Sequence, residues 1–298
     1  MPLALCGSPT DQHGRDMARH GSALLPFGCY IGDVAQINVP WHWHEEMEAA
    51  VVIRGTAILT AGTEQFQVQE GQGVFINSGV LHTTLPKNGP ECQVHWVVFH
   101  PRLVGGNLDS VFWTDYLQPL MADEGRKGVH FNGAQSWHKQ AVDAITNAWD
   151  CGVGEPPGYA FQVREALSRL VYLLCSHQPA AAVPPSKKAQ RDEGRIKTML
   201  QYIQENYASE LTTSDIARSA MVSESECLRC FRSTIRTTPI QYVKQLRVQK
   251  AAELLASGTM SVAEAGALCG FEDASYFTKT FREMKGCTPS AYRARTAV

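Results

Sequence analysis

Long apolar runs are absent from this sequence of 298 residues. The most apolar stretches, residues 49–53 and 170–175, have the length of core segments, whereas a membrane-spanning helix needs about 18 or more apolar residues. The N-terminus also lacks a basic stretch followed by an apolar one, which is the pattern of a secretory signal. We therefore expect no membrane segment and a location in the cytoplasm.

Charged residues make up only 19% of the chain, and cysteines show no regular spacing. The hydrophobic share of 44% is ample for packed cores, which excludes a largely disordered chain. The nine cysteines are odd in number and scattered, so we expect reduced thiols rather than a disulfide framework. The length suits two domains of ordinary size better than one.

Histidine is missing from residues 187–298, although the chain has ten. Residues 1–186 hold 10 basic and 17 acidic side chains, a net charge of −7, whereas residues 187–298 hold 17 and 12, a net charge of +5. The change falls in a stretch rich in Pro and Ala, residues 178–188, which predicts a linker. The basic half has the electrostatic character of a nucleic-acid-binding domain. The opposite net charge of the acidic half indicates that this half binds a partner other than nucleic acid.

The basic half contains an internal repeat. Residues 238–242 read TPIQY and residues 288–292 read TPSAY, and Phe231 and Phe281 keep the same offset of 50 residues. A fixed period of this kind indicates two copies of one supersecondary unit. An apolar stripe predicts that a long helix over residues 240–256 joins the two copies.

Each copy has the pattern of a helix, a tight turn and a second helix. The turns are expected at Met221 in the first copy and Gly270 in the second. Thr213 or Ser214 is predicted to cap the first helix of the first copy, and Ser261 that of the second. Two helices joined by a sharp turn, the second with a polar outer face, form the helix-turn-helix of DNA-binding proteins.

This tandem arrangement over residues 195–295 closely resembles the DNA-binding domain of the AraC/XylS family of bacterial transcription regulators. The motifs that carry the resemblance are DIA at 215–217, FR at 231–232 and 281–282, CGF at 269–271, SYF at 275–277 and TPSAYR at 288–293. The resemblance implies sequence-specific binding of double-stranded DNA, contact with RNA polymerase and, in most members, activation of transcription.

The chain departs from the family pattern at three positions in these units. Ala265 and Gly266 stand where a larger aliphatic residue and Ala are usual, and Met221 replaces a small turn residue. A glycine inside a helix costs about 1 kcal/mol relative to Ala, so we expect the second unit to be soft.

The resemblance and helix geometry together predict the side chains that meet DNA. They are Ser225, Leu228, Arg229 and Arg232 on the first recognition helix, and Ala274, Ser275, Thr278, Lys279 and Arg282 on the second. The guanidinium of Arg229 fits guanine O6 and N7 with two hydrogen bonds, so we predict a base contact there. Arg232 and Arg282 are expected to hold phosphate or to pair with neighbouring acidic side chains. Cys227 and Cys230 form a CxxC motif that can mark zinc or redox sites, but both face inward, which favours core packing.

Residues 23–100 show short strand-like runs broken by Gly and Pro, which favours an antiparallel sandwich or barrel. Residues 42–48 read HWHEEME, and Gly71, Gly79 and His82 follow at fixed spacing. These motifs resemble the two boxes of the cupin superfamily, HxHxxxE and GxxxxxPxGxxH, with Asn77 in place of Pro. AraC/XylS regulators commonly carry such an effector domain. We therefore predict an α+β chain of two domains: a cupin-like β-barrel with trailing helices, then an all-α tandem helix-turn-helix domain.

The first box is expected to place three side chains that can bind a metal or an effector on one face of a strand. His42, His44 and Glu48 share parity there, and His82 would join them from another strand. Three imidazoles and a carboxylate suit a divalent metal such as Zn, Ni, Mn or Fe. The same groups also serve as the polar lining of a cavity that binds an effector without metal, and both alternatives remain. The predicted effector site consists of His42, His44, Glu48, His82, His95 and Trp96, where an aromatic face beside polar groups suits a sugar or an aromatic acid.

The predicted boundaries are 1–22 for an N-terminal arm, 23–177 for the effector-binding and dimerisation domain, 178–190 for a linker, and 191–298 for the DNA-binding domain. An apolar stripe along residues 159–177 either packs on the barrel or pairs with a second subunit, and the resemblance favours a homodimer. The main hypothesis is a regulator, not an enzyme, that responds to a small molecule. The alternative is a metal-dependent cupin enzyme fused to a DNA-binding domain.

Overall fold

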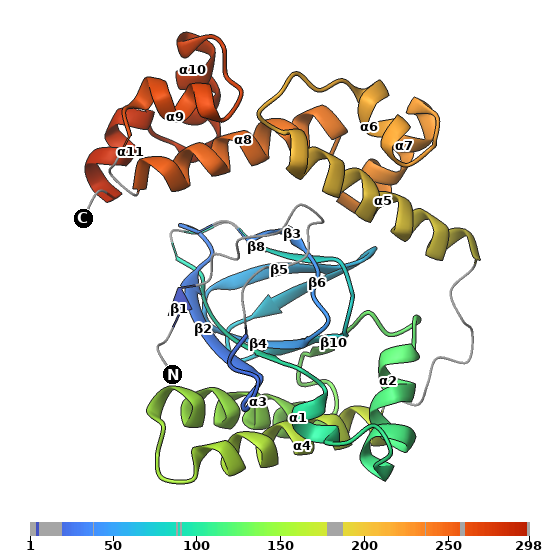
Figure 1. The fold of residues 1–298 in the computed structure, drawn as a ribbon. Coiled ribbons are helices and arrows are strands. Elements are labelled where there is room, and N and C mark those ends of the chain that lie inside the picture. Colours follow the sequence, from blue (N-terminus) through green and yellow to red (C-terminus); the bar gives the residue numbers. More distant parts are fainter. Residues whose placement is uncertain are drawn as a thin grey trace. The chain divides into compact units, whose positions relative to one another are not determined.

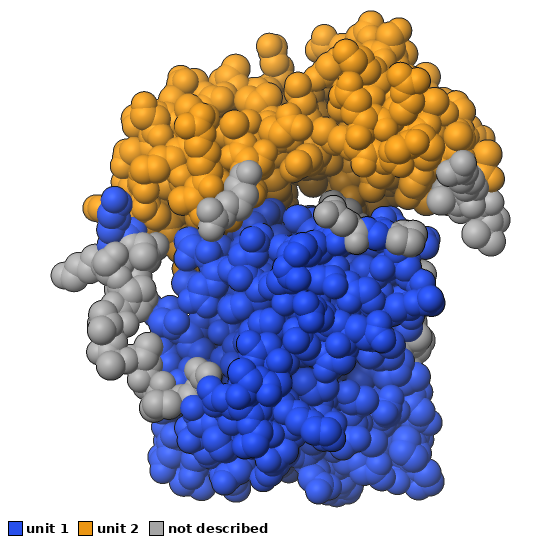
Figure 2. Space-filling view, turned by 180° about the vertical axis from the view of Figure 1, so that it is seen from behind, with its two compact units in different colours: residues 1–10, 15–190 blue, residues 11–14, 191–298 orange. Residues whose placement is uncertain are grey.

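The structure is a computed structural model that describes residues 4–5, 20–37, 39–87, 89, 91–177, 187–235, 237–256 and 260–296. The described chain divides into two compact units, an N-terminal unit that ends at Gln190 and a C-terminal unit that begins at Arg191 (Figure 2). Most of the predicted N-terminal arm and residues 178–186 of the predicted linker lie outside the described residues.

The N-terminal unit is built on two sheets whose strands are almost all antiparallel (Figure 1). The strands are β1 (Ala4–Leu5), β2 (Phe27–Asp33), β3 (Val39–His42), β4 (Met47–Arg54), β5 (Thr56–Ala61), β6 (Glu64–Gln69), β7 (Gly73–Ile76), β8 (His82–Pro86), β9 (Gln93–Phe99) and β10 (Gly128–Phe131). One sheet has the order β1-β2-β9-β4-β7-β10 and the other the order β3-β8-β5-β6.

The strands at the centre of the larger sheet are buried on both faces, and their sequences show why. Alternate residues of a strand point to opposite sides, so β9 sends Val97 and Phe99 into the core shared with the helices. Val94 and Trp96, at the other parity, enter a second apolar core that also contains residues from β5, β6 and β7. Two buried faces require the nearly continuous apolar run that residues 94–99 carry.

Helices follow the strands and cover the larger sheet. They are α1 (Arg102–Gly105), the π-helical turn η1 (Trp113–Leu117), α2 (Gln118–Ala122), α3 (Ser136–Gly154) and α4 (Tyr159–His177). Figure 1 shows α3 and α4 side by side beneath the sheet. The predicted stripe of α4, including Val163, Leu167 and Leu170, is fully buried in this core, so the stripe packs within its own unit. No helix in the described part of the chain combines the length and the apolar character needed to cross a membrane.

The C-terminal unit is entirely helical in its described ranges. Its elements are α5 (Lys187–Asn206), α6 (Thr213–Ser219), α7 (Glu224–Cys230), η2 (Phe231–Ile235), α8 (Pro239–Ala256), α9 (Val262–Leu268), α10 (Ala274–Lys285) and α11 (Pro289–Thr296). Ser261 caps α9 as predicted, in a capping box with Glu264. The cap of α6 is Thr212, with Asp215 as its partner, so the predicted Thr213 and Ser214 were one and two residues too late.

One half-buried arginine, Arg247, connects the two helix-turn-helix units. Arg247, in the joining helix α8, donates to the carbonyl oxygens of Tyr207 at 2.6 Å, Ser209 at 2.7 Å and Gly270 at 2.9 Å. The first two acceptors follow α5 and the third is in the turn of the second unit. The predicted fold class, a β domain followed by an all-α tandem helix-turn-helix domain, is confirmed.

Candidate effector site and DNA interface

The structure brings the four residues of the predicted histidine box together inside the N-terminal unit. His42 ends β3, Glu48 lies in β4, His82 begins β8, and His44 lies between β3 and β4. All four side chains are buried, and each offers one ligand atom such that these atoms lie within 4.8 Å of one another. We call these residues, His42, His44, Glu48 and His82, the histidine cluster.

Backbone carbonyl groups fix the orientation of the three imidazoles. Each Nδ1 atom lies within hydrogen-bond distance of a carbonyl oxygen two residues away: His42 to Pro40 at 2.8 Å, His44 to Glu46 at 3.0 Å and His82 to Val80 at 2.8 Å. Because a carbonyl oxygen only accepts, each Nδ1 must carry the proton, and in a neutral imidazole Nε2 keeps a lone pair. This arrangement is the one that proteins use to orient histidine ligands of metals.

Glu48 lies between two of the Nε2 atoms. Its Oε2 is 3.5 Å from Nε2 of His44 and 3.5 Å from Nε2 of His82, and both of these buried nitrogen atoms lack a hydrogen-bond partner. Burial alone would raise the pKa of Glu48, but the adjacent His82 and His44 lower this pKa well below its ordinary value. A buried carboxylate that stays ionised requires a compensating cation, which a protonated imidazole or a shared metal ion provides.

One further residue beside the cluster, His20, was not found from the sequence. The ring of His20 is 5.2 Å from the ring of His44, and its Nδ1 shares a hydrogen bond of 2.7 Å with the hydroxyl group of Tyr30. His20 is buried, yet it precedes the first predicted strand and belongs to no motif. No pattern in the sequence connects it to the cluster.

The structure separates the two remaining members of the predicted effector site. Trp96 is buried in the core between the sheets, on the same face of the larger sheet as Glu48. His95 has the opposite parity, and its ring stacks on Trp149 of α3 with the ring centroids 3.6 Å apart. Burial lowers the pKa of His95 below its ordinary value. His95 was predicted as an effector-binding residue, but it faces away from the histidine cluster, because adjacent residues of a strand point to opposite faces.

In the C-terminal unit, α7 and α10 are the second helices of their helix-turn-helix units. Most of the predicted DNA-contacting residues are exposed: Ser225, Arg229 and Arg232 on α7 and η2, and Ala274, Ser275, Lys279 and Arg282 on α10. The other two, Leu228 and Thr278, are partly exposed. The opposite faces are buried through Cys227 and Phe231 in one unit and Phe277 and Phe281 in the other. A hollow of about 550 Å³ on the first unit is lined by Ser225, Leu228, Arg229, Arg232 and Ser233.

The cationic side chains on these two faces differ in their surroundings. The guanidinium of Arg229 forms an ion pair with Asp192 of α5, at 2.8 Å from Nη1 to Oδ2. Arg232, Lys279 and Arg282 form no ion pair with any described residue. Asp192 was missed by sequence reasoning, because 37 residues separate it from Arg229 and no motif relates them.

The CxxC motif is part of the core. Cys227 and Cys230 are both fully buried on the inner face of α7, and burial raises the pKa of Cys227 to about 12. A thiol with so high a pKa is neither nucleophilic nor a ready metal ligand. The structural interpretation of this motif is therefore supported by its position, and the described cysteines are all free thiols.

Comparison with known proteins assigns a family to each unit. Residues 25–146 match the family model of the AraC-like ligand binding domain, and residues 216–295 match that of a helix-turn-helix domain. The two matches coincide with the sheet domain that holds the histidine cluster and with the tandem helical domain.

Relatives resemble the chain over nearly its whole length. It is 30% identical over 286 residues to the HTH-type transcriptional regulator YdeC of Bacillus subtilis, which is 95% of this chain and 97% of that protein. It is 28% identical over 264 residues to the HTH-type transcriptional activator RhaR of Mannheimia succiniciproducens, which covers 86% of this chain and 87% of that protein. The solved structure of ToxT from Vibrio cholerae covers 91% of this chain and 99% of its own, at 10% identity and a TM-score of 0.49.

The ligand-binding fold precedes the tandem DNA-binding fold in one chain, and a relative at 30% identity spans both. The chain therefore belongs to the AraC/XylS family of bacterial transcription regulators.

Proposed function

We propose that this protein is a transcriptional activator whose binding to DNA and RNA polymerase is controlled by a small polar effector held at the histidine cluster. The observation that carries the proposal is the buried cluster of three oriented imidazoles and one carboxylate in the ligand-binding domain. A fold that needed only stability would gain little from such a set, because buried polar groups cost free energy unless they are paired. The RhaR relatives are named activators, which supports activation over repression.

We take a sugar as the first candidate for the effector. Imidazole nitrogens and the carboxylate of Glu48 are hydrogen-bonding partners for hydroxyl groups, and Trp96 lies on the same face of the sheet as Glu48. The proposed effector-contacting residues are therefore the histidine cluster and Trp96, with His20 beside His44.

A divalent metal fits the same residues. His42, His44, Glu48 and His82 would hold it, because Nε2 of His44 and His82 are buried without hydrogen-bond partners while all three Nδ1 atoms are already bound. Nitrogen and carboxylate donors suit Zn, Ni, Mn or Fe. When bound, such a metal supplies a Lewis-acidic position for an oxygen atom of the effector.

The two recognition helices form the proposed DNA interface. Two roles are proposed for the residues of this interface. Base edges are contacted by the exposed residues Ser225, Arg229, Ala274, Ser275 and Lys279, together with Leu228 and Thr278. Phosphate is contacted by Arg232 and Arg282. Two helix-turn-helix units on one DNA face reach successive major grooves, which are about 34 Å apart.

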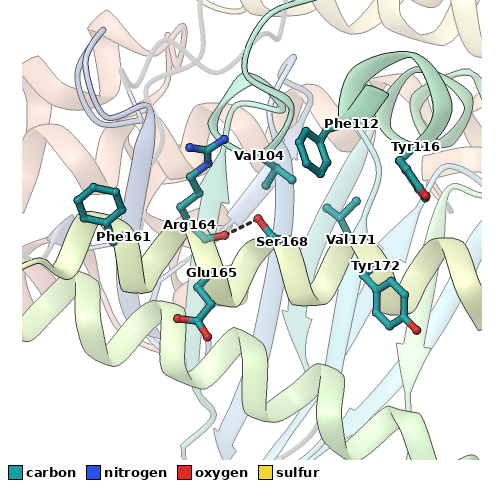
Figure 3. Close-up of a pocket in the computed structure, with 9 residues that line it drawn as sticks. All are labelled: Val104, Phe112, Tyr116, Phe161, Arg164, Glu165, Ser168, Val171 and Tyr172. Carbon is teal, nitrogen blue, oxygen red and sulfur yellow. Dashed lines mark hydrogen bonds between the residues drawn. The ribbon is translucent and has the colours of Figure 1, made fainter. Parts of the chain in front are cut away.

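An aromatic surface on the N-terminal unit supports a homodimer. It surrounds a hollow of about 560 Å³ between α4 and the segment of α1 and η1, shown in Figure 3. Four aromatic side chains there are unusually exposed: Phe112 at 56%, Tyr116 at 44%, Phe161 at 80% and Tyr172 at 51%. Exposed aromatic patches of this kind mark protein interfaces.

A second copy of the chain suits this surface better than an unrelated partner. Arg164 and Glu165 are neighbours on α4, both exposed, and neither forms an ion pair with another described residue. In a two-fold contact, each patch meets its own copy, so Arg164 of one subunit would face Glu165 of the other on antiparallel helices. In such a contact, the charges of one subunit would face opposite charges of the other, and the exposed aromatic residues Phe161 and Tyr172 would be covered by the second copy.

The oriented imidazoles also suit a second function, that of a metal-dependent cupin enzyme attached to a DNA-binding domain. We infer that the cluster serves binding and not turnover, because the relatives are named as regulators. Turnover of a candidate sugar that requires metal and is lost in Glu48→Gln would instead establish the enzyme.

The proposed function is tested by selecting DNA sites with the full chain from a random library and placing a selected site before a reporter gene. We expect a sugar panel to contain a compound that raises reporter expression, and His44→Ala to lose this response while still binding the selected site. A Lys279→Ala, Arg282→Ala double variant should lose site binding. An effector response that survives in His44→Ala contradicts the assignment of the cluster.

A further inference from the structure

The first recognition helix carries an ion pair that holds its arginine. Nη1 of Arg229 donates to Oδ2 of Asp192 at 2.8 Å, and Nη2 donates to Oδ1 at 3.0 Å, so both carboxylate oxygens engage the fork of the guanidinium. Arg195 lies 3.4 Å from the same carboxylate and 3.2 Å from Glu226 of α7. The four side chains form one network that joins the beginning of α5 to the recognition helix.

The repeat provides an internal comparison. Lys279 corresponds to Arg229 at the same offset of 50 residues that relates Phe281 to Phe231. Lys279 is exposed and forms no ion pair within the described ranges. The residue that corresponds to Glu226 is Tyr276, so the second recognition helix also lacks the acidic partner on its own surface. Among the residues that the structure describes, the first unit therefore has this ion pair and the second does not.

The fork of Arg229 cannot serve Asp192 and DNA at the same time. A guanidinium presents parallel N–H groups that match a carboxylate, a phosphate, or the O6 and N7 acceptors of guanine. In this structure the carboxylate occupies that fork. Asp192 is 16% exposed and Arg229 is 41% exposed, so the arginine is the partner with freedom to turn outward.

We propose that Asp192 is a positioning residue that competes with DNA for Arg229 and thereby sets how strongly the first recognition helix engages its site. This inference rests on the proposed contact between Arg229 and DNA. Asp192 lies near the beginning of α5, two residues after the boundary between Gln190 and Arg191 that separates the two units.

The experiment compares Asp192→Asn with a matched control in the full chain. Asparagine removes the charge and keeps the shape, so Arg229 is released. Glu193→Gln removes one negative charge from the next residue of the same helix, whose carboxylate lies 3.4 Å from Lys197. Both variants are also made in an Arg229→Ala background, and thermal unfolding shows that each protein is folded.

Binding is measured on a short synthetic duplex of fixed sequence and on a randomised duplex library, over a series of salt concentrations. We expect Asp192→Asn to bind about threefold to tenfold more tightly than the unsubstituted protein, the range set by an ion pair of ordinary strength. Glu193→Gln should change affinity less. In the Arg229→Ala background, Asp192→Asn and Glu193→Gln should change DNA affinity equally, because Asp192 and DNA no longer compete for Arg229.

Three results would overturn the inference. They are weaker binding by a folded Asp192→Asn protein, equal gains in Asp192→Asn and Glu193→Gln, and a gain that persists without Arg229. If the asparagine variant does not fold, Asp192→Ser removes the same charge with a smaller side chain, and the same expectations apply. Absence of DNA binding by the unsubstituted protein at low salt would instead overturn the proposed DNA interface, and the inference with it.

Discussion

The ring of Phe277 fills the space that a side chain at position 266 would need. A Cβ atom on Gly266 would lie 2.8 Å from Cδ1 of Phe277 and 3.2 Å from two further ring atoms. Gly266 is in the first helix of the second helix-turn-helix unit, and Phe277 is a fully buried residue of its recognition helix. The glycine that the sequence suggested would soften this unit instead lets the two helices approach closely.

Gly266→Ala is therefore expected to destabilise the C-terminal unit. Alanine improves helix propensity by about 1 kcal/mol, but overpacking a core costs about 1–3 kcal/mol, and a buried ring cannot move as a flexible side-chain end does. The net loss in the free energy of unfolding should be about 1 kcal/mol, measured by urea titration. Ala267→Gly, on the exposed side of the same helix, is the control for propensity alone. An increase in stability for Gly266→Ala would show that Phe277 is free to shift.

Met221→Gly should stabilise the first unit. Met221 occupies the turn with φ of 53°, in the left-handed region, and its side chain is 93% exposed. The corresponding Gly270 adopts φ of 79° without this penalty. A left-handed conformation costs an L-residue about 1–2 kcal/mol, and glycine removes this cost. Glycine is also more flexible in the unfolded chain, which offsets about 0.5–1 kcal/mol of the gain. We expect a gain of about 0.5–1 kcal/mol in urea titration. Met221→Ala keeps the Cβ atom and should show no gain, and equal gains in both variants would contradict the role of φ.

The sequence predicted the C-terminal fold well because each local signal agreed with the next. The offset of 50 between Phe231 and Phe281 required two similar units, and the apolar spacing set the faces of their helices. The cap was misplaced at Thr213 or Ser214, since Thr212 and its neighbours are all suitable residues and only backbone geometry distinguishes them. The close approach of Phe277 to Gly266 could not be predicted, because it depends on how two helices pack.

The histidine cluster was predictable in part. The two boxes identified His42, His44, Glu48 and His82. The prediction that one strand carries the first box was wrong, because β3 ends at His42 and β4 begins at Met47. The carbonyl partners that orient the rings depend on local backbone shape. Asn77, which stands where the second box usually has Pro, donates to the carbonyl oxygens of Leu120 and Arg126 at 2.7 and 3.1 Å. Contacts between distant segments such as these carry no signal in a single sequence, as the cases of His20 and Asp192 also show.

Added metal should stabilise the protein if the cluster binds it. The full chain, stripped with a chelator, is titrated with Zn²⁺, Ni²⁺, Mn²⁺ and Fe²⁺ while thermal unfolding is followed. A ligand that binds only the folded state contributes about 2.7 kcal/mol at a free concentration of about 100 times Kd. We expect His82→Ala to lose this stabilisation, because it removes one of the four ligands. His95→Ala, whose ring stacks on Trp149 away from the cluster, is the matched histidine control and should retain it. Loss in both variants, or no response to any metal, would favour an effector site without metal.

The Asp192–Arg229 ion pair should leave a signature in the dependence of stability on pH. The hydrogen bonds from Arg229 outweigh the effect of burial and, with help from Arg195, lower the pKa of Asp192 below its ordinary value of 3.8. A carboxyl group whose pKa is lower in the folded state stabilises the fold fully above its unfolded pKa, and this contribution disappears as the pH falls through the folded pKa.

We therefore expect Asp192→Asn to lower the free energy of unfolding by about 0.5–1 kcal/mol at neutral pH, the size of an exposed ion pair. The difference from the unsubstituted protein should stay constant down to about pH 4 and shrink below it, as the carboxyl group takes up its proton. Urea titrations of both proteins across this range, with Glu193→Gln as a neighbouring carboxyl control, measure the difference. A difference that disappears near neutral pH would assign it to another group, and one that persists unchanged well below pH 3.8 would show that the charge of Asp192 contributes nothing to the fold.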